Sequence, residues 1–216
     1  SLFTFNMPDE PVRELMGVVA ETARVRIIGT DLESIGPLLI THWGMSGPAV
    51  LRLSAWGARV VHGMGYRFTI QVNWLGGLSE DGVRERFRDE GEAIRRKRSD
   101  NANIFKLPKR LWTFLLLKAG ITPEDPWGDL KKKERNRLID LLTNDRYTVQ
   151  GKTTFKEEFV TAGGISLDEV DPLTMRSTKI PGLYFAGEVL DVDGITGGFN
   201  FQAAWTTGFI AGQLRD

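Results

Sequence analysis

The sequence contains no cysteine and only two histidines among its 216 residues. The absence of cysteine excludes disulfides, thiolate nucleophiles, iron–sulfur clusters and zinc fingers, and two histidines nearly exclude a polyhistidine metal site. No apolar run approaches the roughly 20 residues that a membrane-spanning helix needs. An excess of one charge is also missing, because 28 Lys and Arg balance 28 Asp and Glu. This balance excludes a global field for binding polyanions or membranes, but it leaves room for a local patch.

The start of the chain lacks an initiator methionine, and its first basic residue is Arg13. It therefore does not resemble a signal peptide, which needs a basic flank before its apolar region. We expect a cytoplasmic protein. The hydrophobic fraction of 41% is enough to bury a core.

Residues 1–77 are expected to be rich in strands. Apolar and polar residues alternate over 24–27 and 68–72, which is the period of a half-buried strand, and 38–41 form a short apolar run. A turn at 46–48 is expected to open a short helix, with Pro48 near its first turn.

A helical period follows over residues 79–143. Ser79 is expected to cap a first helix, and Gly120 to end a second helix that carries Leu111. Thr122 followed by Pro123 predicts another helix start, and a last helix carries 138–142. Strands are then expected at 147–149, 159–161 and 183–186, before a final helix over 199–212. The fold class is therefore expected to be α+β, a barrel-like β domain with an inserted helical subdomain over about 79–143, followed by a strand–loop–helix unit.

The most informative pattern lies in residues 181–200. An apolar strand ends at Gly187 and is followed by Glu188, and a glycine-rich loop then leads into the final helix. Glycine lets a ligand approach the backbone closely, and the free N–H groups at a helix start favour negatively charged oxygens. The helix carries small residues in line with Asn200, at positions 204, 208 and 212, so one face can lie against a sheet or a flat ring. The alternative is a glycine-rich turn and a tightly packed helix without a ligand.

This segment resembles the C-terminal FAD-binding motif of flavoproteins with two dinucleotide-binding domains. More narrowly, it resembles bacterial NAD(P)/FAD-dependent oxidoreductases that carry an inserted barrel-like domain. Three further stretches match that family in the family's order, namely residues 41–49, 159–165 and 208–212.

The resemblance implies cofactor-binding roles for ten residues. Those near the FAD ribityl–pyrophosphate would be Gly187 and Glu188. Those approaching the flavin from the helix start would be Gly194, Thr196, Gly197, Gly198 and Asn200. Those forming the crossover where the inserted domain rejoins the FAD domain would be Thr161, Gly163 and Gly164.

The sequence departs from the family at one point, because it contains no Gly-x-Gly-x-x-Gly turn for the pyrophosphate. We therefore expect a fragment, with the inserted barrel-like domain at 1–160 and the C-terminal part of the FAD-binding domain at 161–216. The resemblance implies that the full-length parent passes a hydride from NAD(P)H through FAD to an unsaturated acceptor, either a small molecule or an RNA base. The inserted domain would shape the substrate pocket, and the fragment alone is expected to be inactive.

Two smaller features leave alternatives open. His42, beside Gly44, would donate a proton during reduction, or it is a histidine hydrogen-bonded in a turn that shapes the barrel.

Basic residues gather in two clusters of the helical region, which form a solvated helix face or recognise an anionic partner. The second reading gives an alternative function, an RNA- or protein-binding module. Trp112, Trp127 and Tyr147 would stack on bases or simply fill the core. The basic residues are Arg84, Arg86, Arg88, Arg95, Arg96, Lys97 and Arg98, and then Lys131, Lys132, Lys133, Arg135 and Arg137.

Overall fold

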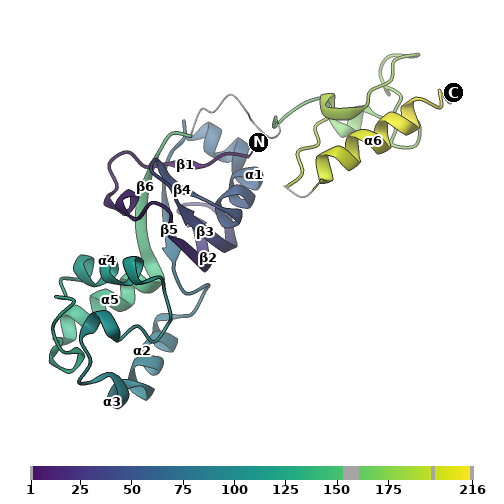
Figure 1. Cartoon of the computed structure of the whole chain (residues 1–216). Coiled ribbons are helices and arrows are strands. Elements are labelled where there is room, and N and C mark those ends of the chain that lie inside the picture. The colour runs from purple at the N-terminus through teal and green to yellow at the C-terminus, as the bar shows by residue number, and fades with distance from the viewer. Residues whose placement is uncertain (1, 153–160, 196–197, 215–216) are drawn as a thin grey trace.

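A computed structural model describes residues 2–152, 161–195 and 198–214 of the chain. Six antiparallel strands form one sheet in the order β1-β4-β3-β2-β5-β6, which nearly closes into a barrel (Figure 1). At the seam, the N–H of Asn6 donates to the carbonyl oxygen of Gly151 (3.1 Å), and Phe5 pairs with Lys152 in an isolated bridge. The strands are β1 (Phe5–Asn6), β2 (Val19–Ile27), β3 (Glu33–Ile40), β4 (Gly44–Ser46), β5 (Arg67–Asn73) and β6 (Asp145–Gln150).

Helices cover the barrel and extend from one of its ends. α1 packs on β3, while α2 to α5 form the helical subdomain between β5 and β6, so the expected α+β architecture is confirmed (Figure 1). Within the described residues, no helix has both the length and the apolar character needed to cross a bilayer. The α-helices are α1 (Pro48–Gly63), α2 (Glu80–Asp89), α3 (Gly91–Ile94), α4 (Lys109–Ala119), α5 (Lys132–Asn144) and α6 (Phe199–Ala211). The short 3₁₀ helices are η1 (Pro11–Leu15), η2 (Ser99–Asn101), η3 (Trp127–Asp129), η4 (Leu167–Glu169) and η5 (Gly187–Val189).

Two predicted helix ends are confirmed and one predicted start is wrong. Ser79 Oγ accepts the N–H of Gly82 (3.1 Å) at the start of α2, and Gly120 ends α4 with a φ of 84°. No helix begins at Thr122. The segment makes a turn instead, because Pro126 disfavours helical backbone at the residue before it and has no N–H to donate. α5 begins only after Lys131, whose N–H donates to Glu134 Oε2 (2.8 Å).

The strand expected at 183–186 is also wrong. The segment makes a single antiparallel bridge, between Arg176 and Tyr184, with one backbone hydrogen bond on each side, and this pairing is too short to form a strand. The strand expected at 159–161 falls largely on 159 and 160, which lie outside the described residues. The helix predicted to open near Pro48 is longer than expected, with 16 residues.

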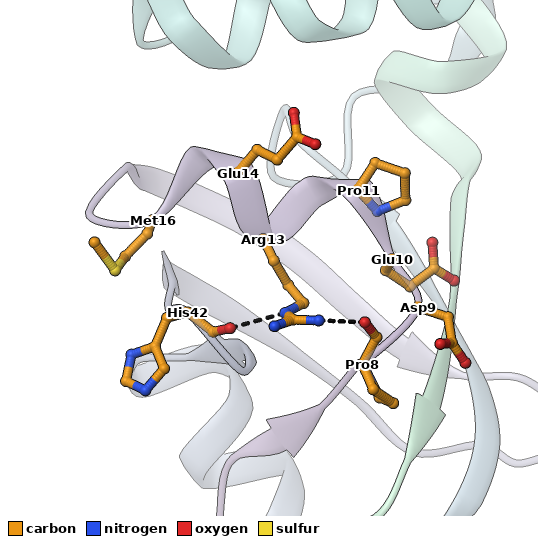
Figure 2. A pocket seen from close by; sticks show the side chains of 8 residues that line it. All are labelled: Pro8, Asp9, Glu10, Pro11, Arg13, Glu14, Met16 and His42. Carbon is orange, nitrogen blue, oxygen red and sulfur yellow. Dashed lines mark hydrogen bonds between the residues drawn. The ribbon is translucent and has the colours of Figure 1, made fainter.

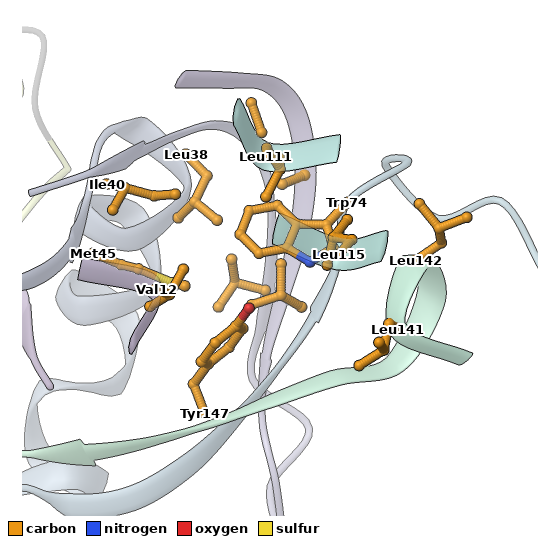
Figure 3. Close-up of a cluster of buried hydrophobic side chains, with 14 of the residues drawn as sticks. Val12, Leu38, Ile40, Met45, Trp74, Leu111, Leu115, Leu141, Leu142 and Tyr147 are labelled. Atoms are coloured by element: carbon orange, nitrogen blue, oxygen red, sulfur yellow. The ribbon is translucent and has the colours of Figure 1, made fainter. Parts of the chain in front are cut away.

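One hydrophobic core runs from the barrel into the helical subdomain. Leu38 of β3 and Met45 of β4 lie opposite Leu111 and Leu115 of α4, all fully buried (Figure 3). Trp112, Trp127 and Tyr147 are 0%, 4% and 1% exposed. This burial confirms that they fill the core and contradicts the alternative that they stack on bases.

The described residues after 160 form a separate small cluster at the other end of the barrel from the helical subdomain (Figure 1). Its buried centre is Val170, Met175 and Leu190. It contacts the rest of the chain beside α1, where Ile195 packs against the small cluster of Leu2 and Ala55. The glycine-rich segment is therefore held next to α1 and far from the basic helices.

Candidate functional site

The glycine-rich segment folds back onto α6. Gly187 begins η5 with a φ of 77°, a conformation that side chains rarely adopt, and its N–H donates to Thr207 Oγ1 of α6 (3.0 Å). Thr207 was not predicted as a site residue, because a threonine inside a helix gives no sequence signal. Glu188, next along η5, is exposed to solvent.

The second half of the loop is held to the start of α6. Asn200 Oδ1 accepts the N–H of Gly194 (2.7 Å), and Asn200 Nδ2 donates to the carbonyl oxygen of Gly194 (3.0 Å). Gly198 precedes the helix with a φ of 87°. Thr196 and Gly197, two other predicted cofactor residues, lie outside the described residues. The pairing of Asn200 with Gly194 brings the two ends of the predicted flavin loop together.

The predicted crossover lies beside the same loop. Ile165 pairs with Leu190 in a parallel bridge, and its N–H donates to the carbonyl oxygen of Val189 (2.9 Å). A Cβ at Gly164 would lie 2.6 Å from the Val189 oxygen, so this glycine is required by backbone packing. Gly163 has open space around it, and Thr161 is exposed. The structure therefore places Gly164 against the η5 loop, while Thr161 and Gly163 make no such packing contact.

An ion pair joins this loop to the barrel. The carboxylate of Asp191 accepts from the guanidinium of Arg59 on α1, and the hydrogen bond and charge of Asp191 raise the pKa of Arg59. The two residues are 132 positions apart, and nothing in the sequence predicts the pair.

α6 presents apolar side chains on most of its surface. Phe199, Phe201, Trp205 and Phe209 are 58–72% exposed. A Cβ at Gly208 would meet nothing within 4 Å, so the close packing expected on the glycine face is not made by the described residues. A helix that is apolar around its whole circumference is normally buried. α6 therefore has the character of a helix that packs against further protein or a flat apolar ring.

The residues present fit one edge of a flavin site. At Gly187 and Gly198, an added Cβ would meet no atom within 4 Å, so both backbones are open to an incoming group. The first N–H groups of α6 have no partner within the helix and suit carbonyl or negatively charged oxygens. Gly164 and Gly194 serve packing and loop closure. The donor set therefore fits FAD at the start of α6 and at η5.

His42 lies at an open hollow of about 650 Å³ on the barrel (Figure 2). Its carbonyl oxygen accepts from Arg13 Nε (2.8 Å), and its ring lies edge-on to Trp43, with 4.2 Å between centroids. Figure 2 shows the imidazole turned away from the carboxylates of the hollow. Glu10 instead accepts the N–H of Thr148 (2.7 Å). The backbone of His42 thus holds the turn, and its imidazole lies at the edge of the hollow.

A buried polar cluster, absent from the sequence analysis, joins the barrel to α4. Asp145 is 1% exposed and accepts from Lys118 Nζ (2.6 Å), from Trp74 Nε1 (3.2 Å) and from the Tyr147 hydroxyl. Burial, and then the charge of Asp145, raise the pKa of Tyr147 well above its ordinary value. The signal was present in β6, where Asp145, Tyr147 and Val149 alternate as inward positions. The cluster fixes the helical subdomain on the barrel.

Comparisons with known proteins agree with this architecture. A family model described as HI0933-like protein barrel and H2TH domain matches residues 1–160. The chain is 33% identical over 207 residues to a ribosomal RNA dihydrouridine synthase of Escherichia coli, covering 94% of this chain and 49% of that protein. It is 29% identical over 215 residues to a 3-dehydro-bile acid delta(4,6)-reductase of Clostridium scindens, covering 99% and 52%. A ribosomal RNA dihydrouridine synthase of Haemophilus influenzae is 29% identical over 207 residues, covering 96% and 48%. The chain therefore spans about half the length of the curated relatives it matches.

Proposed function

The chain belongs to the family of HI0933-like barrel and H2TH domain proteins, and from this premise we propose that it is part of a flavin-dependent oxidoreductase. In this proposal the parent protein transfers a hydride from NAD(P)H through FAD to a carbon–carbon double bond. Residues 1–160 are the inserted domain that shapes the acceptor pocket, and 161–216 are the C-terminal part of the FAD-binding domain.

The names of the relatives support a reduction. A dihydrouridine synthase produces a uridine whose C5–C6 double bond has been reduced, and a delta(4,6)-reductase acts on double bonds of a fused-ring molecule. Both names describe the reduction of carbon–carbon double bonds. An unsaturated acceptor is therefore the class that both relatives share.

The observation that carries the proposal is the glycine-rich loop folded onto the start of α6, with open backbone at Gly187 and Gly198. We assign Gly187 and Glu188 to the ribityl–pyrophosphate end of FAD, and the start of α6 to the flavin. The remaining proposed contacts are Gly194, Thr196, Gly197 and Asn200, with Thr161, Gly163 and Gly164 at the crossover.

When bound, FAD would supply the hydride chemistry between NAD(P)H and one carbon of the acceptor, and the other carbon would receive a proton. The protein's own contribution is to orient the reactants and to exclude water. The N–H groups at the start of α6 would favour negative charge developing near them. The Asp191–Arg59 pair would hold the loop in register with α1.

Charge distribution favours an RNA base over a small molecule as the acceptor. Residues 79–144 hold sixteen Lys and Arg against twelve Asp and Glu, while the rest of the chain holds twelve against sixteen. The helical subdomain is therefore the positively charged part of a neutral chain. A module that only binds RNA or protein through this subdomain is the second candidate, and it would show no flavin chemistry.

The test is an anaerobic titration of the longer protein that contains this chain, loaded with FAD. NADH or NADPH should bleach the visible flavin absorption, and ribosomal RNA lacking the modification should restore it. Restoration by an unsaturated steroid and not by RNA would keep the reductase and change the acceptor. Bleaching by neither nucleotide would contradict the proposed hydride transfer.

A further inference from the structure

The helical subdomain contains a groove between α2–α3 and η3–α5. It encloses about 360 Å³, a volume within the usual range of ligand sites. We call it the arginine groove, after Arg88, Arg95 and Arg135, which line it together with Phe87, Glu92 and Trp127. A neighbouring hollow of about 570 Å³ shares Glu92 and Arg95 and adds Arg96. Arginines therefore line both hollows.

The walls of the groove are held rigidly. The rings of Phe87 and Trp127 lie 4.8 Å apart at 36°, which fixes α2 to η3. The N–H of Gly128 donates to the carbonyl oxygen of Arg95 (2.9 Å), and a Cβ at Gly128 would lie 2.8 Å from Arg95 Cγ. This glycine therefore allows η3 to approach α3 closely. The backbone around the groove is thus held by packing, while Arg88 and Arg95 at its mouth are exposed.

The arginines of the groove have capacity for a ligand. Arg135 Nη2 donates to the carbonyl oxygen of Gly128 (3.1 Å), but its Nε is buried and has no acceptor among the described residues. A buried N–H without an acceptor is costly unless a ligand or water satisfies it. Arg88 has no ion-pair partner in the described part of the chain. Arg95 pairs only loosely with Glu92, at 3.8 Å, and both side chains are mostly exposed.

The chemistry suits a phosphodiester strand. A guanidinium group presents a planar fork of donors that matches phosphate oxygens, and the half-buried ring of Phe87 gives a nucleobase an apolar wall. Arginines that continue from one hollow into the next match a ligand whose negative charges repeat. Two other arginines of the subdomain, Arg84 and Arg98, are already paired. Arg98, for example, donates to Asp100 and Glu124, and the first of these contacts raises its pKa.

We infer that the arginine groove binds the phosphate backbone of single-stranded RNA and so presents the acceptor strand to the reductase. This inference rests on the proposed function and adds the place where the substrate is held. It assigns Arg88 and Arg95 to phosphates at the mouth of the groove and Arg135 to the floor.

The test is fluorescence anisotropy of a labelled oligouridine RNA with the full chain, at several salt concentrations and without FAD. Arg88→Gln with Arg95→Gln removes two charges, and the double variant should bind roughly tenfold more weakly than the parent chain at low salt. The slope of log affinity against log salt should fall by about 1.4, because each phosphate contact on a single strand contributes about 0.7. The matched control is Arg67→Gln with Arg146→Gln, two exposed arginines on β5 and β6, which should change affinity by less than about twofold.

Glu92→Gln removes the one acid that lines the groove, so this variant should bind RNA more tightly than the parent chain. Because a misfolded variant would not gain affinity, tighter binding excludes misfolding as the explanation. An equal loss in the barrel control, or no loss in the groove variant, would overturn the inference. Displacement of the RNA by polyglutamate at equal charge would assign the groove to an acidic protein instead. FAD retention is measured separately from RNA binding. A protein that holds no flavin but binds RNA through the groove as expected would contradict only the proposed function.

Discussion

Asp145→Asn removes the charge at the centre of the buried cluster and keeps its shape. The parent carboxylate accepts from Lys118 Nζ at 2.6 Å, from Trp74 Nε1 at 3.2 Å and from the Tyr147 hydroxyl. Breaking a buried ion pair by removing one partner costs about 3–5 kcal/mol. The Lys118 side chain is 30% exposed and regains some hydration, which places the expected cost near the lower limit, at about 3 kcal/mol.

Urea unfolding followed by tryptophan fluorescence measures this loss, since Trp74 and Trp112 are both in the core. For a chain of this length, 3 kcal/mol corresponds to a fall in Tm of about 6–12 °C. Asp191→Asn is the matched control, because Arg59 is 67% exposed and a surface pair contributes at most about 1 kcal/mol.

A double-mutant cycle separates the pair from the rest of the cluster. Lys118→Met alone leaves the Asp145 charge buried without its cation and should also destabilise strongly. The double variant should be no less stable than the worse single variant, which gives a coupling energy of at least about 3 kcal/mol, the smaller of the two single losses. Additive losses, or a cost of Asp145→Asn below about 1 kcal/mol, would show that the buried pair does not stabilise the fold.

Two further predictions concern backbone and pH. Gly44→Ala should lower the free energy of unfolding by roughly 3 kcal/mol or more, because its φ is 156° and an added Cβ would collide with the carbonyl oxygen of Phe5. The control Gly29→Ala has a φ of 84° and open space around the added Cβ, so it should lower the free energy of unfolding by about 1 kcal/mol. Equal losses in chemical unfolding would contradict the clash at Gly44. The pKa of Asp171 is lowered below 3.8 by the N–H of Leu173 and the hydroxyl of Thr174. The carboxylate thus stabilises the C-terminal cluster above about pH 4, and this contribution is lost as the pH falls through the lowered pKa. A carboxyl chemical-shift titration with a midpoint at or above 3.8 would contradict this.

The barrel could be predicted because its strands alternate in polarity along single segments. In β6, inward Tyr147 and Val149 alternate with outward polar residues, and in β5 the same holds for Phe68, Ile70 and Val72. Local signals also placed Ser79 and Gly120 correctly at helix ends. Such signals succeed where the backbone bonds are made within a few residues.

The errors came from long-range contacts. At Thr122, Pro126 disfavours helical backbone before it, and the pairing of Pro126 with Arg98, which no local pattern shows, holds the segment in a turn. The strand expected at 183–186 depends on neighbouring strands that the described residues do not supply. Partners from distant segments decide both features, so residue order alone predicts the wrong element.

The sequence predicted which residues belong to the candidate site, but only part of the contacts that hold them in place. Glycine spacing indicated the loop, and the structure connects it through the unpredicted Thr207 and Arg59. Gly164 was expected to contact the cofactor, yet the backbone oxygen of Val189 lies where its Cβ would be, so packing alone requires a glycine here. A glycine pattern predicts that another group approaches the backbone closely. Only the structure tells whether the chain's own backbone or open space lies beside each glycine.

In the proposed function, FAD binds at the start of α6. The direct measurement is the visible absorption spectrum of the longer protein after loading with FAD and desalting, for the parent and two alanine variants. Gly198→Ala and Gly182→Ala introduce a Cβ into open space at similar φ values, 87° and 79°, so they share the same backbone strain. We expect the parent and Gly182→Ala to retain FAD and Gly198→Ala to lose it. Flavin absent from the parent, or retained equally by all three, would contradict the claim.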